Sequence, residues 1–169
     1  MIHTLILSDS PVGPLTLQAD DHGLCRIDYG QRCTQQHPDH PVLQSAAQQL
    51  KAYFAGLLTR FDLPLAPVGT PFQEQVWSQL LEIPWGQTRS YGEIAAALGK
   101  PGASRAVGMA NNRNPLSIII PCHRVIGSNG ELTGYGGGLE KKIRLLQLER
   151  VPIRPAEQPE HARVIHNPS

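Results

Sequence analysis

The sequence predicts a two-part α/β protein, in which a small antiparallel sheet with one helix precedes a mostly helical part. Two observations lead to this prediction. Short strand-like runs separated by turns occupy the first thirty residues, whereas helical patterns with one short strand-like segment dominate beyond residue 70. Two prolines and a glycine mark residues 59–69 as a linker. We therefore expect domains at 1–69 and 70–150, followed by a flexible, proline-containing tail at 151–169.

The first part contains three expected strands and one helix. The strands are apolar runs at 3–7, 15–17 and 24–29, and a turn containing proline and glycine at 10–13 separates the first two. The helix is predicted because apolar residues recur at a spacing of 3.6. These apolar positions are Val42, Leu43, Ala46, Ala47, Leu50, Tyr53, Phe54 and Leu57.

The second part begins with a well-defined helix start. Thr70 is a favourable N-cap residue and Pro71 suits the first helical position. Two short helices follow at 91–98 and 103–110, joined by a glycine-containing turn. They have the outline of a helix-turn-helix, although two ordinary packed helices would give the same pattern. A last helix is expected at about 139–149. The buried stripe expected for the first of these helices is Phe72, Val76, Leu80 and Leu81.

The charge is distributed unevenly along the chain. Residues 1–83 hold four Lys/Arg and eight Asp/Glu, a balance of −4, whereas residues 84–150 hold nine and four, a balance of +5. A basic second half suits a polyanionic partner, although a dispersed, solvated surface would give the same count. The sequence has no apolar run near 18 residues and no signal peptide, and its three cysteines are expected as thiols. We therefore expect a cytoplasmic protein.

A cysteine beside a histidine is the most informative pair in the sequence. Cys122 and His123 follow the apolar, strand-like run 118–120 and a proline. A thiol is a strong nucleophile only as a thiolate, and a nearby imidazole can accept its proton. Adjacent residues of a straight strand point to opposite faces. A turn is therefore needed after Pro121 if both side chains are to serve one site.

Five segments of the chain resemble the O6-alkylguanine–DNA alkyltransferase family, in order and at its spacing. The resemblance covers roughly residues 70–150, and the first half is less specifically similar to bacterial members. It implies a ribonuclease-H-like first part and a helix-turn-helix in the second. The five segments are YGEIA at 91–95, ASRAVG at 103–108, NP at 114–115, PCHRVI at 121–126 and GYGG at 134–137.

The resemblance implies a DNA-repair protein of which each molecule reacts only once. A methylated-DNA–protein-cysteine S-methyltransferase flips O6-alkylguanine out of duplex DNA and moves the alkyl group irreversibly to its own cysteine. O4-alkylthymine is a further expected substrate. The expected partner is double-stranded DNA carrying the lesion, with no membrane and no cofactor. The protein is expected to be a monomer, and whether molecules cluster along DNA stays open.

Catalytic roles follow from the same resemblance. Cys122 is the alkyl acceptor, His123 takes its proton through a water, and Glu149 orients the histidine. Tyr91 donates a proton to the leaving guanine, and Asn114 bonds the backbone near the cysteine. The sequence supports Glu149 independently, because it follows two leucines by three and four residues and no Lys or Arg precedes it at that spacing. The alternatives are a frayed helix end for Glu149, ordinary packing for Tyr91 and a plain turn for Asn114.

Further residues are implied in DNA binding and in the substrate pocket. Arg105 is the finger that fills the space left by the flipped base, on a helix that approaches the minor groove. Small residues would let this helix lie close to the groove. Some members of the family have serine where this chain has Gly136, which leaves the backbone N–H as the donor. The other implied residues are Ala103, Ser104, Ala106 and Gly108 for DNA, and Val125, Tyr135, Gly136 and Gly137 for the pocket.

Two other kinds of protein share part of this pattern. A non-catalytic relative that only binds damaged DNA would have tryptophan in place of Cys122. A thiol hydrolase would use the Cys-His-Glu set but needs no arginine-bearing helix or basic half. A zinc site among His22, Cys25, Cys33, His37 and His40 is not expected, because their spacing matches no standard framework and strand alternation places Cys25 in the core.

Overall fold

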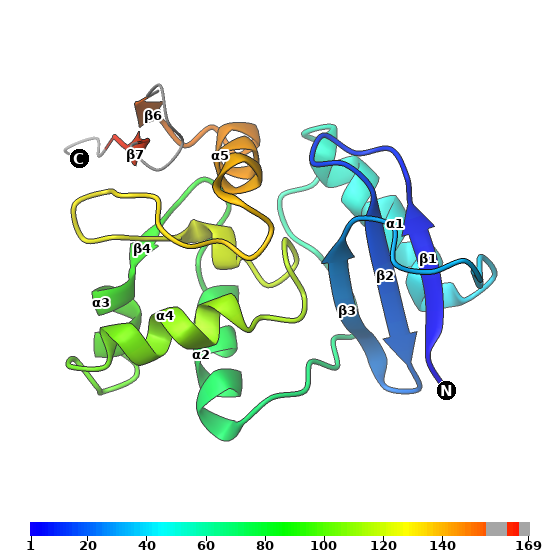
Figure 1. Ribbon diagram of the computed structural model, residues 1–169, viewed down its shortest axis with the longest axis horizontal. Coiled ribbons are helices and arrows are strands. Elements are labelled where there is room, and N and C mark those ends of the chain that lie inside the picture. Colours follow the sequence, from blue (N-terminus) through cyan, green and yellow to red (C-terminus); the bar gives the residue numbers. More distant parts are fainter. Residues whose placement is uncertain (155–161, 166–169) are drawn as a thin grey trace. The chain divides into compact units, whose positions relative to one another are not determined.

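The computed structural model describes residues 1–154 and 162–165, which divide into two compact units (Figure 1). Unit 1 consists of residues 1–68 together with 115–119. Unit 2 consists of residues 69–114 and the described residues from 120 onward. The chain therefore crosses between the units more than once, because a short segment just before the Cys-His pair belongs to unit 1.

Unit 1 is a three-stranded antiparallel sheet with a helix packed on it, as the sequence predicted. The strand order is β1-β2-β3, and α1 contacts all three strands. The helix buries Leu43, Ala46 and Leu50 completely, which are members of the predicted apolar stripe. The elements are β1 (His3–Leu7), β2 (Leu15–Asp20), β3 (Gly23–Tyr29) and α1 (Pro41–Phe54).

A β-bulge in this sheet corrects the expectation for Cys25. The register pairs Gln18 with Arg26 and then Ala19 with Leu24, so that Cys25 is the extra residue of β3. A bulge breaks the strict alternation of side chains between the two faces. Leu24 and Ile27 are therefore both buried, whereas Cys25 is only half-buried and its thiol donates to the Gln18 carbonyl oxygen at 3.5 Å.

The apolar run before the Cys-His pair is a turn and not the strand expected from its composition. Ile118 has a φ of 78°, in the left-handed region, which an extended strand does not allow. The amide of Ile27 donates to the Pro115 carbonyl oxygen at 2.9 Å, which ties this segment to β3. Ile118 is 1% exposed, so burial in unit 1 accounts for its apolar character.

Unit 2 is mostly helical and includes the predicted helix-turn-helix pair. Reciprocal capping boxes begin α2 at Thr70 and α3 at Ser90, which satisfies amides that would otherwise lack partners. A two-stranded parallel pairing joins β4 to β5. The elements are α2 (Pro71–Leu81), β4 (Arg89–Ser90), α3 (Tyr91–Ala97), α4 (Ser104–Asn112), the 3-10 turn η1 (Cys122–Arg124), β5 (Val125–Ile126) and α5 (Leu139–Leu148).

The buried face of α2 differs in part from the predicted stripe. Val76 and Leu80 are fully buried as expected, but Leu81 is 48% exposed. Trp77 takes the place of Leu81, and its indole N–H donates to the Ala110 carbonyl oxygen at 2.9 Å. This buried hydrogen bond joins α2 to α4 and satisfies the one polar group of the tryptophan.

The described part of the predicted tail forms two short strands and packs on unit 2. Strands β6 (Ile153–Arg154) and β7 (Arg163–Val164) pair antiparallel. Val151, Ala162 and Val164 are buried in one hydrophobic cluster with Ile126, Leu132 and Leu146. The apolar residues of the tail thus have a partner surface on α5 and β5. The rest of the predicted tail, 155–161 and 166–169, lies outside the described residues.

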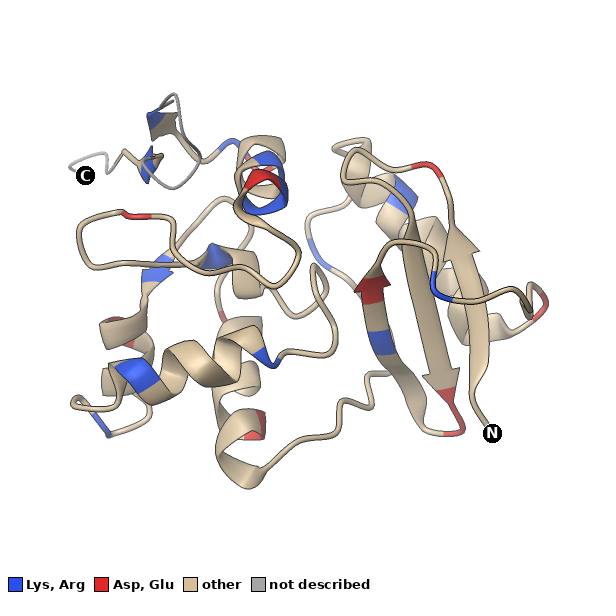
Figure 2. Cartoon of the chain, viewed as in Figure 1, with Lys and Arg blue, Asp and Glu red and all other residues tan. Residues whose placement is uncertain are grey.

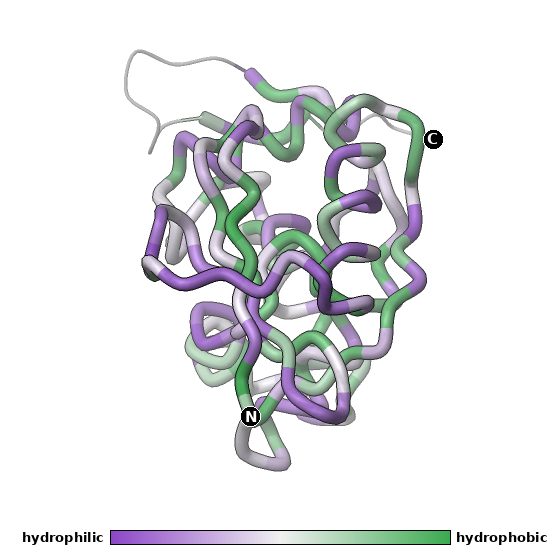
Figure 3. Tube along the Cα trace, turned by 90° about the vertical axis from the view of Figure 1, so that its right-hand side faces the viewer, coloured by the Kyte–Doolittle hydropathy of each residue, from purple (hydrophilic) through white to green (hydrophobic). Residues whose placement is uncertain are grey.

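Helix α5 is amphipathic and short. Leu145 and Leu146 are fully buried, whereas Arg144 and Gln147 are exposed. Hydrophilic and hydrophobic colours alternate within single helices of the trace, as amphipathic packing requires (Figure 3). Over residues 1–154 and 162–165, the helices are too short or too polar to cross a membrane.

The capping box of α2 gives a test of this architecture. Thr70→Ala removes the hydroxyl that accepts from the Gln73 amide at 3.2 Å, and we expect the free energy of unfolding to fall by about 1 kcal/mol. Thr70→Ser keeps the acceptor and should change stability little. Urea denaturation of the three proteins measures the difference, and equal losses in both variants would contradict the role assigned to the cap.

Candidate active site

The turn η1 positions Cys122 at the start of the site. Cys122 is 4% exposed, and its amide donates to the Ile120 carbonyl oxygen at 2.7 Å. The Asn111 side-chain amide donates to the Cys122 carbonyl oxygen at 3.3 Å, and that of Asn114 donates to Ile120 at 2.8 Å. Two asparagines therefore hold the backbone on either side of Pro121. Asn114 contacts the backbone near the cysteine as the resemblance implied, whereas the role of Asn111 was not predicted.

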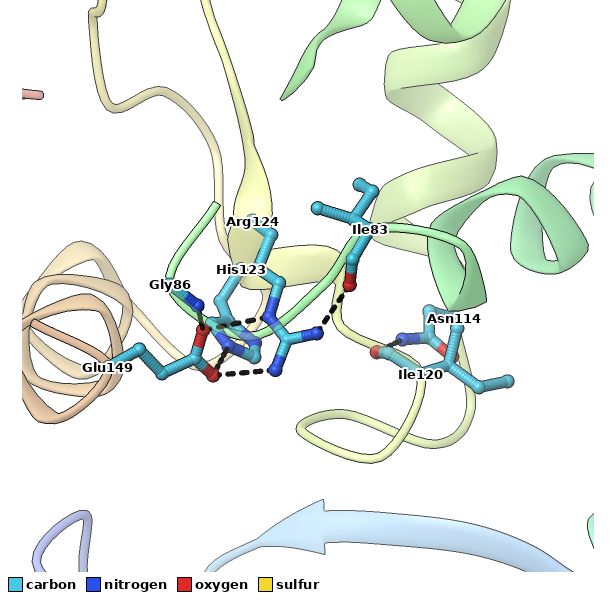
Figure 4. A network of polar contacts seen from close by, with 7 residues as sticks. All are labelled: Ile83, Gly86, Asn114, Ile120, His123, Arg124 and Glu149. Carbon is cyan, nitrogen blue, oxygen red and sulfur yellow. Dashed lines mark hydrogen bonds and ion pairs between the residues drawn. The ribbon is translucent and has the colours of Figure 1, made fainter. Parts of the chain in front are cut away.

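His123 and Glu149 form a fully buried pair. The two side chains are 0% exposed, and the histidine Nε2 lies 2.7 Å from the Glu149 Oε2 (Figure 4). An ionised carboxylate only accepts hydrogen bonds, so Nε2 carries the proton and Nδ1 holds the lone pair. Nδ1 is buried and has no hydrogen-bond partner among the described residues. Burial lowers the pKa of His123, and the contact with Glu149 opposes that shift.

Arg124 is the second side chain that donates hydrogen bonds to the Glu149 carboxylate. Its Nε and Nη2 donate to Glu149 Oε1 and Oε2 at 2.7 and 2.9 Å, and its Nη1 donates to the Ile83 carbonyl oxygen at 2.6 Å. Burial alone would raise the pKa of Glu149, but the hydrogen bonds and charges of His123 and Arg124 outweigh it. Together they hold the pKa of Glu149 well below its usual range. Arg124 lies in the PCHRVI motif, but the resemblance implied no role for it.

Lys142 is a buried cation that sequence reasoning missed. Its side chain is 0% exposed, and its Nζ donates to the carbonyl oxygens of Val125 and Thr133 at 2.7 and 3.0 Å. Burial lowers the pKa of Lys142 to about 8, and the charge of Cys122 opposes that shift. The helical pattern contained a signal for it, because Lys142 precedes the buried Leu145 and Leu146 by three and four residues.

Tyr91 lies at the first position of α3 and is partly buried. Its hydroxyl accepts from the Thr133 hydroxyl at 3.3 Å and donates to the Thr133 carbonyl oxygen at 3.4 Å. Burial raises the pKa of Tyr91; the hydrogen bond from Thr133 lowers it, and the charge of Cys122 raises it further. The phenol is therefore protonated at neutral pH.

The residues implied in DNA binding lie on α4 and just before it. Arg105 and Ala106 are exposed, while Ala103, Ser104 and Gly108 are partly buried. Basic segments occur on α4, in the turn before it and on α5 (Figure 2). This exposed, partly basic helix is available to an anionic partner.

The segment implied in the substrate pocket is a glycine-containing turn before α5. Tyr135 and Gly137 are partly buried, and the Tyr135 carbonyl oxygen accepts from the Gly138 amide at 2.9 Å. Gly136 is exposed, and a Cβ atom added to it would meet no other atom within 4 Å. Serine would therefore fit at this position as well as glycine.

The candidate zinc ligands of the first part are arranged differently from the ligands of a metal site. The rings of His37 and His40 pack on His3, with centroids 4.9 and 4.6 Å apart from it. His37 Nδ1 accepts from the Thr4 amide at 3.0 Å. In the described ranges, no three His, Cys, Asp or Glu side chains are placed to hold a metal ion.

Comparison with known proteins covers both parts of the chain. Residues 1–67 match the family model "6-O-methylguanine DNA methyltransferase, ribonuclease-like domain", and residues 71–151 match "6-O-methylguanine DNA methyltransferase, DNA binding domain". A methylated-DNA–protein-cysteine methyltransferase of Mycobacterium bovis is 53% identical over 155 residues, which cover 89% of this chain and 93% of the relative. These matches confirm the predicted fold class.

Solved structures give the same result. The crystal structure of the O6-methylguanine methyltransferase of Mycobacterium tuberculosis is similar, with a TM-score of 0.80 and 50% identity over 89% of this chain and 93% of that one. A crystal structure of a protein from the same organism in complex with DNA has a TM-score of 0.77 and 50% identity, covering 88% and 92%. The similarity spans nearly the full length of both chains.

The buried Lys142 gives a pH-dependent test of the site. Its pKa is about 8 in the folded protein against an ordinary 10.5, so between these values the unfolded chain binds more protons. The free energy of unfolding should therefore rise with pH in this window, by up to about 1.4 kcal/mol per pH unit from this group. Lys142→Met should remove that part of the rise, whereas the exposed Lys51→Met should retain it. Urea denaturation between pH 7 and 10 measures the slopes, and equal slopes for wild type and Lys142→Met would contradict the shift.

Proposed function

Because the chain belongs to the 6-O-methylguanine DNA methyltransferase family, we propose that it repairs O6-methylguanine in DNA by moving the methyl group to its own Cys122. The observation that supports this assignment most directly is the buried His123–Glu149 pair, 2.7 Å apart, with the histidine adjacent to Cys122 in the sequence. The pair lies inside the segment that matches the DNA-binding domain of the family. Each protein molecule reacts once, because the acceptor is consumed.

The first chemical step is activation of the thiol. Glu149 accepts the Nε2–H of His123 and leaves the lone pair on Nδ1, which can take the Cys122 proton through a water molecule. The resulting thiolate attacks the methyl carbon of the lesion. A carbon–sulfur bond forms as the bond from carbon to O6 breaks, and the electron pair of that bond leaves with the guanine.

The leaving guanine is neutralised by a proton. The Tyr91 hydroxyl is the donor we propose, because burial and the charge of Cys122 raise its pKa and keep it protonated at neutral pH. General acid help of this kind contributes roughly 10²–10⁴-fold to a rate. The product is a thioether, which no group of the site can reverse, so transfer is stoichiometric and irreversible. Asn111 and Asn114 hold the backbone of the cysteine during the reaction.

The substrate pocket is proposed around the flipped base. The carbonyl oxygens of Cys122 and Val125 face the guanine amino group, and Tyr135 with Gly136 and Gly137 forms the other wall. Lys142 already donates to the Val125 oxygen at 2.7 Å, and a carbonyl oxygen can accept a second hydrogen bond, which we assign to the substrate. Lys142 therefore fixes one wall of the pocket. O4-alkylthymine is a further proposed substrate.

The proposed partner is duplex DNA that carries the lesion. Arg105 extends from α4 as the finger that occupies the place of the flipped base, and Ala103, Ser104, Ala106 and Gly108 allow the helix to approach the minor groove. Phosphate contacts from the basic second half would make binding sensitive to salt. We propose that the protein acts as a monomer in the cytoplasm.

Intact mass after reaction tests the proposed function. A duplex with one O6-methylguanine should add one methyl group per protein, saturating at one, and peptide mapping should place it on Cys122. Cys122→Ser should add none, because the acceptor is gone. Cys25→Ser and Cys33→Ser are matched controls that should react as the wild type does. An unchanged wild-type mass with the lesion intact would contradict the proposed repair function.

The finger role of Arg105 has a separate test. Extruding a base from a duplex costs a few kcal/mol and costs least when the base is already single-stranded. Arg105→Ala should therefore slow methyl transfer from duplex DNA on the order of tenfold or more, and slow transfer from a single-stranded oligonucleotide much less. Arg113→Ala, which removes an exposed arginine at the end of the same helix, is the matched control. Equal losses on both substrates would contradict a role in base extrusion.

A further inference from the structure

The Glu149 carboxylate is shared by two side chains, and the reaction proposed above uses only His123. Arg124 occupies both oxygens of the same carboxylate, through Nε at 2.7 Å and Nη2 at 2.9 Å (Figure 4). Its remaining nitrogen, Nη1, donates to the Ile83 carbonyl oxygen at 2.6 Å. The arginine side chain is only 8% exposed. A buried guanidinium with three protein acceptors is a built feature of this site.

The contacts of Arg124 fix the orientation of the carboxylate. Two parallel N–H donors of one rigid guanidinium bind the two oxygens of Glu149, so the carboxylate cannot rotate about its last bond without losing both. The Gly86 amide adds a weaker contact to Oε1 at 3.4 Å. Oε2 is thereby held 2.7 Å from His123 Nε2, which sets the plane of the imidazole and the direction of Nδ1.

Arg124 also balances the charge that His123 meets. The charged or titratable groups around the imidazole are Cys122 and Arg124 within η1, and Lys142 and Glu149 on α5 and at its end. On the side of α2, which also packs against η1, the contact is made by Arg124, whose Nη1 donates to the uncharged Ile83 carbonyl oxygen just after that helix. An unshared carboxylate beside a buried imidazole would favour the imidazolium form. The arginine on the same carboxylate opposes this effect, in the same direction as burial and Lys142.

We propose that Arg124 is a positioning residue for methyl transfer, which holds and neutralises the Glu149 carboxylate so that His123 rests uncharged with Nδ1 able to accept the Cys122 proton. This inference rests on the proposed function. In the step it serves, the thiol proton passes through water to Nδ1 and the sulfur keeps the electron pair. Arg124 stays protonated throughout and neither gives nor takes a proton.

Two substitutions separate the charge of Arg124 from its geometry. Arg124→Gln removes the cation, and the pH midpoint of His123 protonation should rise by about one unit or more. The rate of methyl transfer from a methylated duplex should then begin to fall at a correspondingly higher pH on the acid side. Arg124→Lys keeps the charge and loses the paired donors, so it should slow transfer about tenfold at every pH and leave the acid-side midpoint in place.

Nitrogen NMR of the histidine ring, recorded without DNA, measures the first effect, with the His123 signals assigned by their loss in His123→Asn. The wild type should show the Nε2–H tautomer at neutral pH. Arg144→Gln removes an exposed arginine from α5 and should change neither midpoint. A charged His123 in the wild type at pH 7, or an unmoved midpoint in folded Arg124→Gln, would overturn the inference.

If Arg124→Gln does not fold, the wild-type tautomer and the pH profile of Arg124→Lys decide, since a displaced acid-side midpoint in the lysine variant would contradict the proposal. If the wild type transfers no methyl group, the proposed function fails. The ring titration still tests the link between Arg124 and His123 in that case.

Discussion

A single buried carboxylate organises the active-site segment. Glu149 is 0% exposed, and an ionised carboxylate without partners would cost several kcal/mol to bury. Its donors come from segments far apart in the sequence, namely His123 and Arg124 of η1 and the Gly86 amide. Satisfying this one charge therefore fixes the end of α5, the turn with the cysteine and the segment after α2 relative to one another. The proposed reaction uses the same charge to direct the imidazole.

A buried cation provides a second fixed point. The Lys142 ammonium binds the carbonyl oxygens of Val125 and Thr133, which belong to the strand after the cysteine and to the loop before α5. Thr133 also contacts the Tyr91 hydroxyl on α3. The turn that holds Cys122 is thus bonded to a buried anion through His123 and Arg124, and the strand that follows it is bonded to a buried cation. Rigid surroundings of this kind suit a protein that reacts once, because its acceptor must be aligned before the substrate arrives.

Local sequence signals were sufficient to predict most elements of the fold. Thr70-Pro71 marks the start of α2, and the capping box found there satisfies its first amides. The strands β1 to β3 and the stripe of α1 follow from periodicity alone. Two of the failures are of one kind. Cys25 and the run at 118–120 look like core strand residues, yet a bulge and a left-handed φ at Ile118 remove them from regular strands. Strand and core propensity indicate neither feature, because a bulge depends on the register of the paired strand and the φ of Ile118 departs from the extended backbone that its composition favours.

The sequence by itself determined the family, the fold class and the identity of the Cys-His pair, because these depend on residue types at fixed spacings. Tertiary structure alone decided which buried charges meet. Arg124 and Lys142 read as ordinary basic residues in the sequence, and their burial becomes favourable only when Glu149 and distant carbonyl oxygens supply acceptors. The packing of the tail has the same cause, since Val151 and Val164 are buried only where α5 and β5 offer an apolar surface. Such partnerships join residues far apart in the chain. Short-range patterns can place Lys142 on the buried face of its helix, but they do not identify the acceptors that it meets.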